Sequence, residues 1–393
     1  MTAERWAQFR ADTPALEQYA YLNTGFTGPM SRTVVRAMQD RMDFEVAQGP
    51  TTKAVMEAGR DIRERLGERF GQMLGVGWDE VAITSSTTIG VSIGVNGLDL
   101  QPGDRLLTTG VEHVGGAVPL YRAREQHGAD VEFVAVSPDD SHGVIAERFA
   151  AAIDDRTRIV VLSEISYSTG QLLPVEPIVE AAHRVGAIVV IDGAQTGGHI
   201  PIDVRASGVD VYAIPAQKWL CGPRGIGAVY VSPEALPRIN PLIVDGSYAE
   251  EWDLSGGFQP KQDVAGKYQT SAVSPTLAAG AIAAIEQYLE SGPQAVWDRA
   301  RDLNRIAEQR FERIDGVTVA SPRNDQSRTG LFCFAAQGLP AADLAAWLQE
   351  QHQVVCRAVR ERDVVRLSLH VFNTEDDIER TALGVEQALR EGI

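Results

Sequence analysis

Residues 213–227 of the chain read AIPAQKWLCGPRGIG, and the apolar run AVYVS follows at residues 228–232. Lys218 is the only lysine between Lys53 and Lys261, and it lies just before a glycine-rich turn. Burial disfavours the charged ammonium, so such a lysine can become a neutral amine that attacks a carbonyl group. A lysine that merely extends its charge from the end of a buried strand would give the same local pattern. The rest of the chain has to decide between these two interpretations.

Composition and charge limit the classes of protein that the chain can belong to. Its 393 residues, 44% of them hydrophobic, are enough for two domains with substantial cores. The net charge of −17 disfavours nucleic acid and anionic membranes as partners. No apolar run is long enough to cross a membrane, and residues 1–10 lack the apolar core of a signal peptide. The three cysteines are far apart, which argues against disulfides and metal sites and favours a reducing cytoplasm.

Strand-like and helix-like segments alternate through the first two thirds of the chain. This alternation predicts a mostly parallel sheet with helices on both faces. Residues 271–393 predict a smaller α+β domain instead, and residues 245–270 show no clear element, as expected for loops at an interface or an active site. The predicted strands of the large sheet are residues 80–84, 105–109, 130–136, 157–162, 187–191, 211–214 and 228–232.

Four hydroxyl side chains, Ser85-Ser86-Thr87-Thr88, lie between the strand at 80–84 and an apolar helix. Free backbone N–H groups, the positive end of the helix dipole and side-chain donors meet at such a point, which favours an anion. Simple capping of the helix by Thr87 or Thr88 is the alternative, but it needs only one hydroxyl. The sequence therefore favours a phosphate site here.

His113 and Asp192 each follow a predicted strand of the sheet. Open α/β sheets hold their ligands at the carboxyl ends of the strands, where an imidazole can stack on a flat heterocycle or move a proton. His113 alone could equally be a loop histidine without a role. A carboxylate at a strand end needs donors or a cation, such as a protonated pyridine nitrogen, unless Asp192 is only a helix cap. Lys218 comes one strand later, so both side chains are expected at the same sheet edge.

These motifs, in this order, resemble the pyridoxal 5′-phosphate (PLP) enzymes of fold type I, in the class V aminotransferase group. That group includes cysteine desulfurases, cystine and cysteine-conjugate C–S lyases, and proteins similar to isopenicillin N epimerase. The resemblance covers nearly the whole chain and is strongest at residues 191–195 (IDGAQ) and 217–225 (QKWLCGPRG). It implies an α/β fold with a seven-stranded-type sheet, divided into an N-terminal segment at 1–30 on the small domain or active site, a large PLP-binding domain at 31–270 and a small domain at 271–393.

The resemblance also implies roles for individual residues. Lys218 matches the lysine that forms the Schiff base and moves the proton at Cα. Asp192 matches the carboxylate that keeps the pyridine nitrogen protonated and so makes the ring an electron sink. His113 matches the imidazole stacked on the ring. The other matches are Thr87, Thr88 and Gln217 at the phosphate, Gln195 at the ring's 3-oxygen, Thr270 (or Ser271) reaching the phosphate of a partner subunit, Arg366 at the substrate's α-carboxylate, and Asn23 on the substrate side.

The chain departs from the family pattern at several of these places. Pro215 and Gln217 stand where desulfurases have a serine and a histidine. Tyr167 replaces an asparagine near the ring's 3-oxygen, and it would either supply its hydroxyl there or only enclose the site. A desulfurase also needs a mobile cysteine that accepts sulfur as a persulfide, between two C-terminal arginine motifs. Residues 357–365 contain none, and Cys356 falls in a predicted buried strand, so desulfurase activity is disfavoured.

We therefore expect a homodimeric PLP enzyme, with a shared active site, that acts on a small α-amino acid. The favoured reaction is C–S β-elimination, which converts a cysteine S-conjugate to thiol, pyruvate and ammonia. Epimerisation is the first alternative, followed by transamination and by a decarboxylating or oxidative reaction. A nicotinamide-dependent reductase is disfavoured, because the glycines at 222–227 lead into a strand and not into a helix. A non-catalytic binding protein would not need Lys218, Asp192, His113 and Arg366 together.

Overall fold

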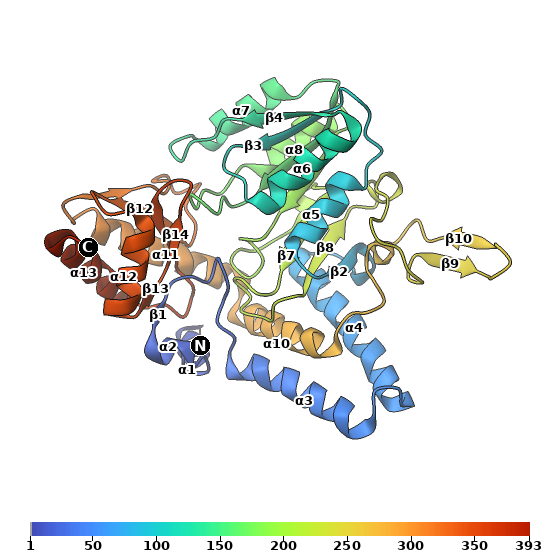
Figure 1. The fold of residues 1–393 in the computed structure, drawn as a ribbon, viewed down its shortest axis with the longest axis horizontal. Helices are drawn as coiled ribbons and strands as arrows, with labels where there is room; N and C mark the ends of the chain where they lie inside the picture. The colour runs from blue at the N-terminus through green and yellow to red at the C-terminus, as the bar shows by residue number, and fades with distance from the viewer. Residues whose placement is uncertain (1) are drawn as a thin grey trace.

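A seven-stranded sheet forms the centre of the computed structural model, which describes residues 2–393 (Figure 1). β8 runs antiparallel to both of its neighbours, and all the other neighbouring pairs are parallel. This arrangement confirms the predicted fold class. The strands lie in the order β2 (Val81–Thr84), β8 (Gly227–Val231), β7 (Val211–Pro215), β6 (Ile188–Asp192), β5 (Thr157–Ser163), β3 (Arg105–Thr109) and β4 (Asp130–Val134).

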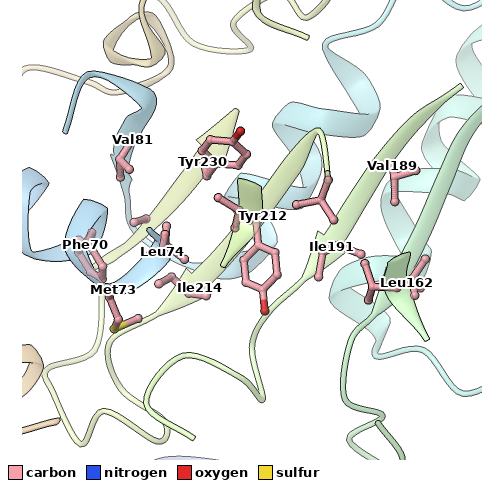
Figure 2. Packing of buried hydrophobic residues seen from close by; sticks show 14 of the residues in the cluster. Phe70, Met73, Leu74, Val81, Leu162, Val189, Ile191, Tyr212, Ile214 and Tyr230 are labelled. Carbon is pink, nitrogen blue, oxygen red and sulfur yellow. The ribbon is translucent and has the colours of Figure 1, made fainter. Parts of the chain in front are cut away.

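Helices cover both faces of this sheet because its central strands are apolar on both sides. In β6 all five residues are buried, with Val189 and Ile191 in one core cluster and Val190 in the other. Figure 2 shows the first cluster, in which Phe70 and Leu74 of α4 belong to the same core as Tyr212 and Ile214 of β7. The helices of this part are α3 (Arg32–Gln48), α4 (Lys53–Leu74), α5 (Thr87–Asn96), α6 (Val114–His127), α7 (His142–Ala152), α8 (Val175–His183), α9 (Val204–Ser207) and α10 (Pro275–Ser291).

A second, four-stranded antiparallel sheet forms the smaller part of the molecule, at the left of Figure 1. Its separate core includes Phe332, Phe334 and Leu367. The helix α10 packs on α3 and α4, and its apolar side chains join the core of the large sheet. The packing favours a domain boundary after α10, and the division into domains stays a proposal. The smaller part contains β11 (Val317–Val319), β12 (Leu331–Ala336), β15 (Val364–Ser368), β14 (Arg357–Val359), α11 (Pro293–Phe311), α12 (Ala341–His352) and α13 (Glu375–Glu391).

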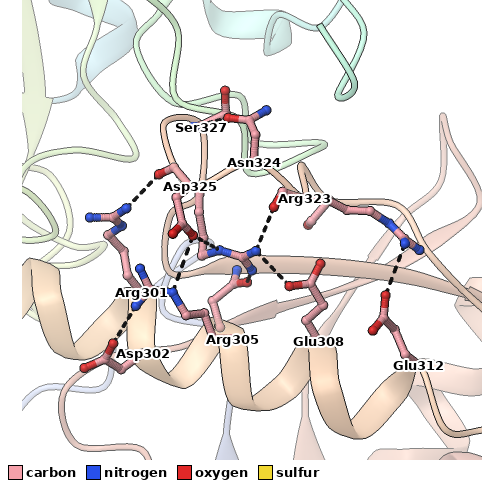
Figure 3. Close-up of polar contacts among 12 residues, drawn as sticks. Arg301, Asp302, Arg305, Glu308, Glu312, Arg323, Asn324, Asp325 and Ser327 are labelled. Atoms are coloured by element: carbon pink, nitrogen blue, oxygen red, sulfur yellow. Dashed lines mark hydrogen bonds and ion pairs between the residues drawn. The ribbon is translucent and has the colours of Figure 1, made fainter. Parts of the chain in front are cut away.

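A network of charged side chains holds the segment between β11 and β12 of the small sheet against α11 (Figure 3). The buried Arg328 pairs with Glu308 of α11 at 2.7 Å and with Asp325 at 3.1 Å. The next residue, Thr329, donates its hydroxyl to the carbonyl oxygen of Gly170 at 2.7 Å, and so joins this segment to a loop of the large sheet. The network therefore holds the small sheet against the loop that follows β5.

The N-terminal segment contacts both the smaller part of the molecule and the turn that follows β7. It contains α1 (Thr2–Ala11), α2 (Ala15–Gln18) and β1 (Ala20–Tyr21), and β1 pairs in parallel with β13 (Val354–Val355). The loop after β1 continues along β15, where Asn23 forms an isolated bridge with Ser368. Residues 20–28 therefore lie between the small sheet and the turn that carries Lys218.

A β-hairpin, β9 (Ala249–Trp252) and β10 (Phe258–Pro260), stands away from the body of the molecule (Figure 1). The sequence predicted no element here, because the two strands are short and carry charged and polar residues on both faces. Trp252, Leu254 and Phe258 are all exposed. Three short 3₁₀ helices complete the fold, η1 (Trp78–Glu80), η2 (Leu236–Arg238) and η3 (Ala265–Tyr268). Within residues 2–393, no helix combines the length and the apolar character needed to cross a membrane.

Candidate active site

The predicted site residues gather at the carboxyl edge of the large sheet. Ser163 and Asp192 are register neighbours at the ends of β5 and β6, and Asp192 pairs with Ala213 in β7, which ends two residues later at Pro215. Asp192 is 4% exposed, and its Oδ1 accepts a hydrogen bond of 2.9 Å from the backbone N–H of Ala194. Lys218 follows β7 and reaches the same edge. Desolvation lowers its pKa to about 8, against the opposing charge of Asp192, so roughly a tenth of the lysine is a neutral amine at pH 7, far more than for an ordinary lysine.

The turn that carries Lys218 is packed so closely against Gly28 that no side chain would fit at that position. A Cβ at Gly28 would lie 2.3 Å from the carbonyl oxygen of Lys218 and 2.6 Å from Sγ of Cys221. The N–H of Gly28 donates to the carbonyl oxygen of Gln217 at 2.8 Å. The N-terminal loop therefore lies directly on the lysine turn, and only glycine allows this approach.

The predicted phosphate site lies at the N-terminus of α5. Ser86 caps this helix, because its Oγ accepts from the N–H of Ile89, so the alternative of a cap at Thr87 or Thr88 is wrong. The Oγ1 of Thr87 is buried without a hydrogen-bond partner in the described chain. Thr88 is exposed, and a Cβ at Gly115 would lie 2.7 Å from its Oγ1. The N-termini of α5 and α6 thus meet beside two threonine hydroxyls that are free to bind an anion.

His113 is the N-cap of α6 and lies at the mouth of the site. Its Nδ1 accepts from the N–H of Gly115 at 3.0 Å, and its ring meets that of Tyr167 edge-on, with centroids 5.2 Å apart. Desolvation and the charge of Lys218 lower its pKa, while Asp192 raises it. The imidazole is therefore mostly neutral near pH 7, which suits stacking on a ring or accepting a proton.

Glu112, next to His113, is a site residue that sequence reasoning missed. Its carboxylate accepts hydrogen bonds from the Thr109 hydroxyl at 2.7 Å, the Ser163 hydroxyl at 2.6 Å and the Ser163 N–H at 2.9 Å. These bonds tie the ends of β3 and β5 together below His113. Desolvation raises the pKa of Glu112 to about 7. The only signal in the sequence was that Glu112 is next to His113. Glutamates in loops are usually solvated, so this signal alone did not point to a role for Glu112.

Arg366 enters the site from β15 of the small sheet. It is 2% exposed, and its Nη1 donates to the carbonyl oxygen of Tyr167 at 2.9 Å, while its Nε has no partner in the described chain. Desolvation lowers its pKa to about 10, so it remains charged at neutral pH. Arg357 is its register neighbour on β14. A buried guanidinium with a free donor is suited to a carboxylate.

The two amides predicted at the site, Asn23 on the substrate side and Gln195 at the ring's 3-oxygen, have different surroundings. The Oδ1 of Asn23 is buried without a partner in the described residues. The side chain of Gln195 donates to the carbonyl oxygen of Gly25 at 2.8 Å and accepts from the Trp219 indole at 2.9 Å. Gln195 therefore joins the N-terminal loop to the lysine turn, and its contact with the ring's 3-oxygen stays a prediction.

Thr270 lies in a loop held by a carboxylate. Asp245 accepts from the N–H of Ser271 at 2.6 Å and from its hydroxyl at 2.9 Å. Because Ser271 uses its hydroxyl in this way, Thr270 is the better candidate for the contact with a partner's phosphate. That contact remains a proposal.

The three cysteines are poorly placed for sulfur transfer. Cys221 and Cys333 are buried, and Cys356 is part-buried. Desolvation raises the pKa of Cys333 to about 11 and that of Cys356 to about 12, and raises that of Cys221 further. A thiol of this kind carries almost no thiolate at neutral pH and is a weak nucleophile.

The arrangement fits PLP and defines a class of enzyme. The desolvated amine of Lys218 suits an aldehyde, the unpartnered Oγ1 of Thr87 at a helix N-terminus suits a phosphate, and the buried carboxylate of Asp192 suits a protonated ring nitrogen. In residues 2–393, no three His, Cys, Asp or Glu side chains gather in a way that could hold a metal ion. The fold and the site are those of a PLP-dependent enzyme of fold type I.

Comparison with known proteins then gives the family. The aminotransferase class V family model matches residues 20–381, and the chain belongs to this family. It is 28% identical to a probable cysteine desulfurase of Methanothermobacter thermautotrophicus, over 95% of this chain and 96% of the relative. It is 29% identical to probable cysteine desulfurase 2 of Mycobacterium leprae, over 97% and 96%. A solved structure of a cystine C–S lyase with its product cysteine persulfide shares the fold, with a TM-score of 0.89, 24% identity and coverage of 95% and 99%.

Proposed function

We propose that the chain is a C–S β-lyase that cleaves a cysteine S-conjugate to a thiol, pyruvate and ammonia. The observation that carries the proposal is the combination of a desolvated base, Lys218, with a buried arginine, Arg366, whose Nε has no partner among the described residues, at a site without a reactive thiol. The names of the relatives, which are desulfurases and a lyase, support cleavage of a carbon–sulfur bond.

The residues of the chain account for the individual steps. Arg366 binds the α-carboxylate and so orients the Cα–H bond toward Lys218. Lys218, as a neutral amine, removes the Cα proton as a general base. When PLP is bound at Lys218, Asp192 and Thr87, it supplies an electron sink for the pair that this proton leaves behind. The Cβ–S bond then breaks with its electron pair on sulfur, and the thiolate leaves. One water per turnover balances the overall conversion of the conjugate to thiol, pyruvate and ammonia.

A cysteine desulfurase is the second candidate, favoured by the names of the relatives. It would release alanine from cysteine and transfer the sulfur to an enzyme thiol. The burial and the raised pKa values of all three thiols support the lyase over this alternative. The interval 357–365, where the family places the acceptor cysteine, is a short β-hairpin without one.

We further propose a cytoplasmic homodimer in which Thr270 completes the phosphate site of the partner. Two features support the dimer. Thr270 lies in a loop that Asp245 fixes at the surface, and the hairpin β9–β10 exposes Trp252, Leu254 and Phe258. Exposed apolar side chains at a protruding hairpin are typical of a contact surface.

Product analysis tests the proposed reaction. The PLP-loaded protein is incubated in deuterated water with cysteine, with cystine and with S-alkyl-cysteines, and the products are followed by mass spectrometry. Pyruvate with a released thiol is expected, and the variant Lys218→Ala should form none. Alanine from cysteine that is lost in Cys356→Ser would establish a desulfurase instead. Deuterium at Cα without cleavage of any conjugate would establish an epimerase-type reaction.

A further inference from the structure

Trp219 directly follows Lys218, and its buried indole ring packs in a small core cluster with Leu331 of the small sheet. The indole Nε1–H donates to Oε1 of Gln195 at 2.9 Å. On the other side of the same amide, Nε2 of Gln195 donates to the carbonyl oxygen of Gly25 at 2.8 Å. An indole N–H can only donate and a carbonyl oxygen can only accept, so the two contacts together fix the orientation of the amide.

Two buried histidines hold the indole in place. The His199 ring stacks on it, with centroids 3.7 Å apart and planes 8° apart. Nε2 of His199 accepts from the N–H of Gly330 at 2.9 Å, so its proton is on Nδ1, which donates to the carbonyl oxygen of Gln195 at 2.8 Å. His370, two residues after β15, donates from Nε2 to the carbonyl oxygen of Trp219 at 3.0 Å. The indole is therefore fixed by contacts from both sheets.

The amide of Gln195 has one donor to spare. Its NH₂ group carries two hydrogens, of which one is used by Gly25 and the other has no partner within residues 2–393. Gln195 lies three residues after Asp192, in the turn that is predicted to contact the PLP ring. Hydrogen bonds in a chain polarise one another, so the bond from the indole to Oε1 makes the remaining N–H a stronger donor.

We propose that Trp219 is a positioning residue, whose indole N–H orients the Gln195 amide so that its NH₂ group, and not its oxygen, is presented to the 3-oxygen of PLP. The inference goes beyond the lyase proposal, because it rests on the predicted contact of Gln195 with the 3-oxygen and not on the reaction that follows. Without the indole N–H, Oε1 of Gln195 would be a buried acceptor without a donor, and the amide would have to turn to find another one.

The visible absorption of the PLP-loaded protein, recorded between pH 6 and pH 10, tests this role without any substrate. The absorption changes when the nitrogen that joins Lys218 to PLP loses its proton, and a donor at the 3-oxygen stabilises the negative charge that then remains on that oxygen. Gln195→Ala removes the donor and should therefore raise the pH midpoint by about one unit. Trp219→Phe should raise the midpoint by a smaller amount. In the Gln195→Ala background, Trp219→Phe should have no further effect.

A second tryptophan of the same cluster provides the matched control. Trp297 also contacts the His199 ring, with centroids 5.6 Å apart, but in the described chain it forms no hydrogen bond with Gln195. Trp297→Phe should therefore leave the midpoint unchanged. If Trp219→Phe does not fold, site-specific replacement of Trp219 by benzothienylalanine serves instead. In that residue a sulfur atom takes the place of the indole N–H, so the stacked ring is kept and only the donor is lost.

Each outcome has a defined meaning. An unchanged midpoint in Gln195→Ala would overturn the predicted contact with the 3-oxygen, and with it the role of Trp219. A raised midpoint in Gln195→Ala but not in the Trp219 variants would overturn the positioning role alone. A Trp219 effect that persists in the absence of the Gln195 side chain would also overturn it, because the indole would then act by another route. The lyase proposal is tested separately by its products.

Discussion

At the scale of single residues, desolvation is the main physical cause behind the candidate site. It lowers the pKa of Lys218 and of Arg366 and raises that of Glu112. The consequences differ, because the lysine comes near neutrality while the arginine stays charged. The candidate site therefore combines an amine that can lose its charge near neutral pH with a guanidinium that keeps its charge, which suits the roles proposed for Lys218 and Arg366.

The pKa of Lys218 gives a prediction about cofactor capture. Only the neutral amine attacks an aldehyde, so the rate at which the apo-protein takes up PLP should rise with pH, with a midpoint near pH 8, and level off well above that midpoint. Since the charge of Asp192 raises this pKa, Asp192→Asn should move the midpoint to lower pH. Stopped-flow absorbance between pH 6 and pH 10 measures both. A rate that climbs without a plateau, as for an ordinary lysine, would show that Lys218 is not desolvated.

At the scale of elements, the site depends on loops from four parts of the chain that pack closely together. The N-terminal loop lies on the lysine turn, and the segment after α11 holds the loop that carries Tyr167. Strand ends alone would leave Lys218 and Arg366 on separate sheets. These loop contacts bring the two sheets to one site.

The close approach of Gly28 can be tested by adding one methyl group. In Gly28→Ala the new Cβ meets the carbonyl oxygen of Lys218 at 2.3 Å, so the loop or the turn must move. We expect a loss of about 1–3 kcal/mol in the free energy of unfolding, with weaker retention of PLP during dialysis. Gly246→Ala is the matched control, because nothing lies within 4 Å of a Cβ there. Equal behaviour of the two variants would contradict this packing.

The brace around Arg328 predicts a loss of stability on truncation. Without this arginine, the largely buried carboxylate of Glu308 has lost its cationic partner. Arg328→Ala should therefore lower the free energy of unfolding by about 3 kcal/mol. Arg305→Ala, whose side chain is 37% exposed, should cost less than about 1 kcal/mol. Urea titration followed by circular dichroism compares the two. Similar losses would mean that the buried pair contributes no more than the surface one.

Sequence patterns predicted the elements of the large sheet better than the contacts of the site. The strand before Asp192 was recognisable because five consecutive apolar residues imply burial on both faces. The Ser86 cap and the Glu112 contacts were not predictable, since each depends on which hydroxyl groups the fold brings close. The hairpin at 249–260 was not predicted, because its strands have no buried face and therefore show no alternation of apolar and polar residues.

At the scale of the whole molecule, the proposed shared site predicts that two defective subunits can complement each other. A dimer of Thr270→Ala with Lys218→Ala contains one site with both an intact lysine and an intact threonine. Mixing the two variants under subunit exchange should therefore restore activity, up to about a quarter of the wild-type value for random pairing. A double variant, Lys218→Ala with Thr270→Ala, mixed with wild type is the control. No recovery despite exchange, measured by native mass spectrometry, would place Thr270 outside the partner's site.

The pairing of β1 with β13 sets a time order for biosynthesis. Ala20 leaves the ribosome long before its partner Val354 is translated, because the two are 334 residues apart in the sequence (354 − 20). The N-terminal loop of the nascent chain therefore remains exposed to solvent, without its partner strand, while the residues of the large sheet are translated and fold. A polypeptide that stops before residue 354 lacks the strand on which this loop aligns. The candidate site, which also includes Arg366, is thus completed late in synthesis, and chains that end before residue 354 should carry the lysine turn without its cover.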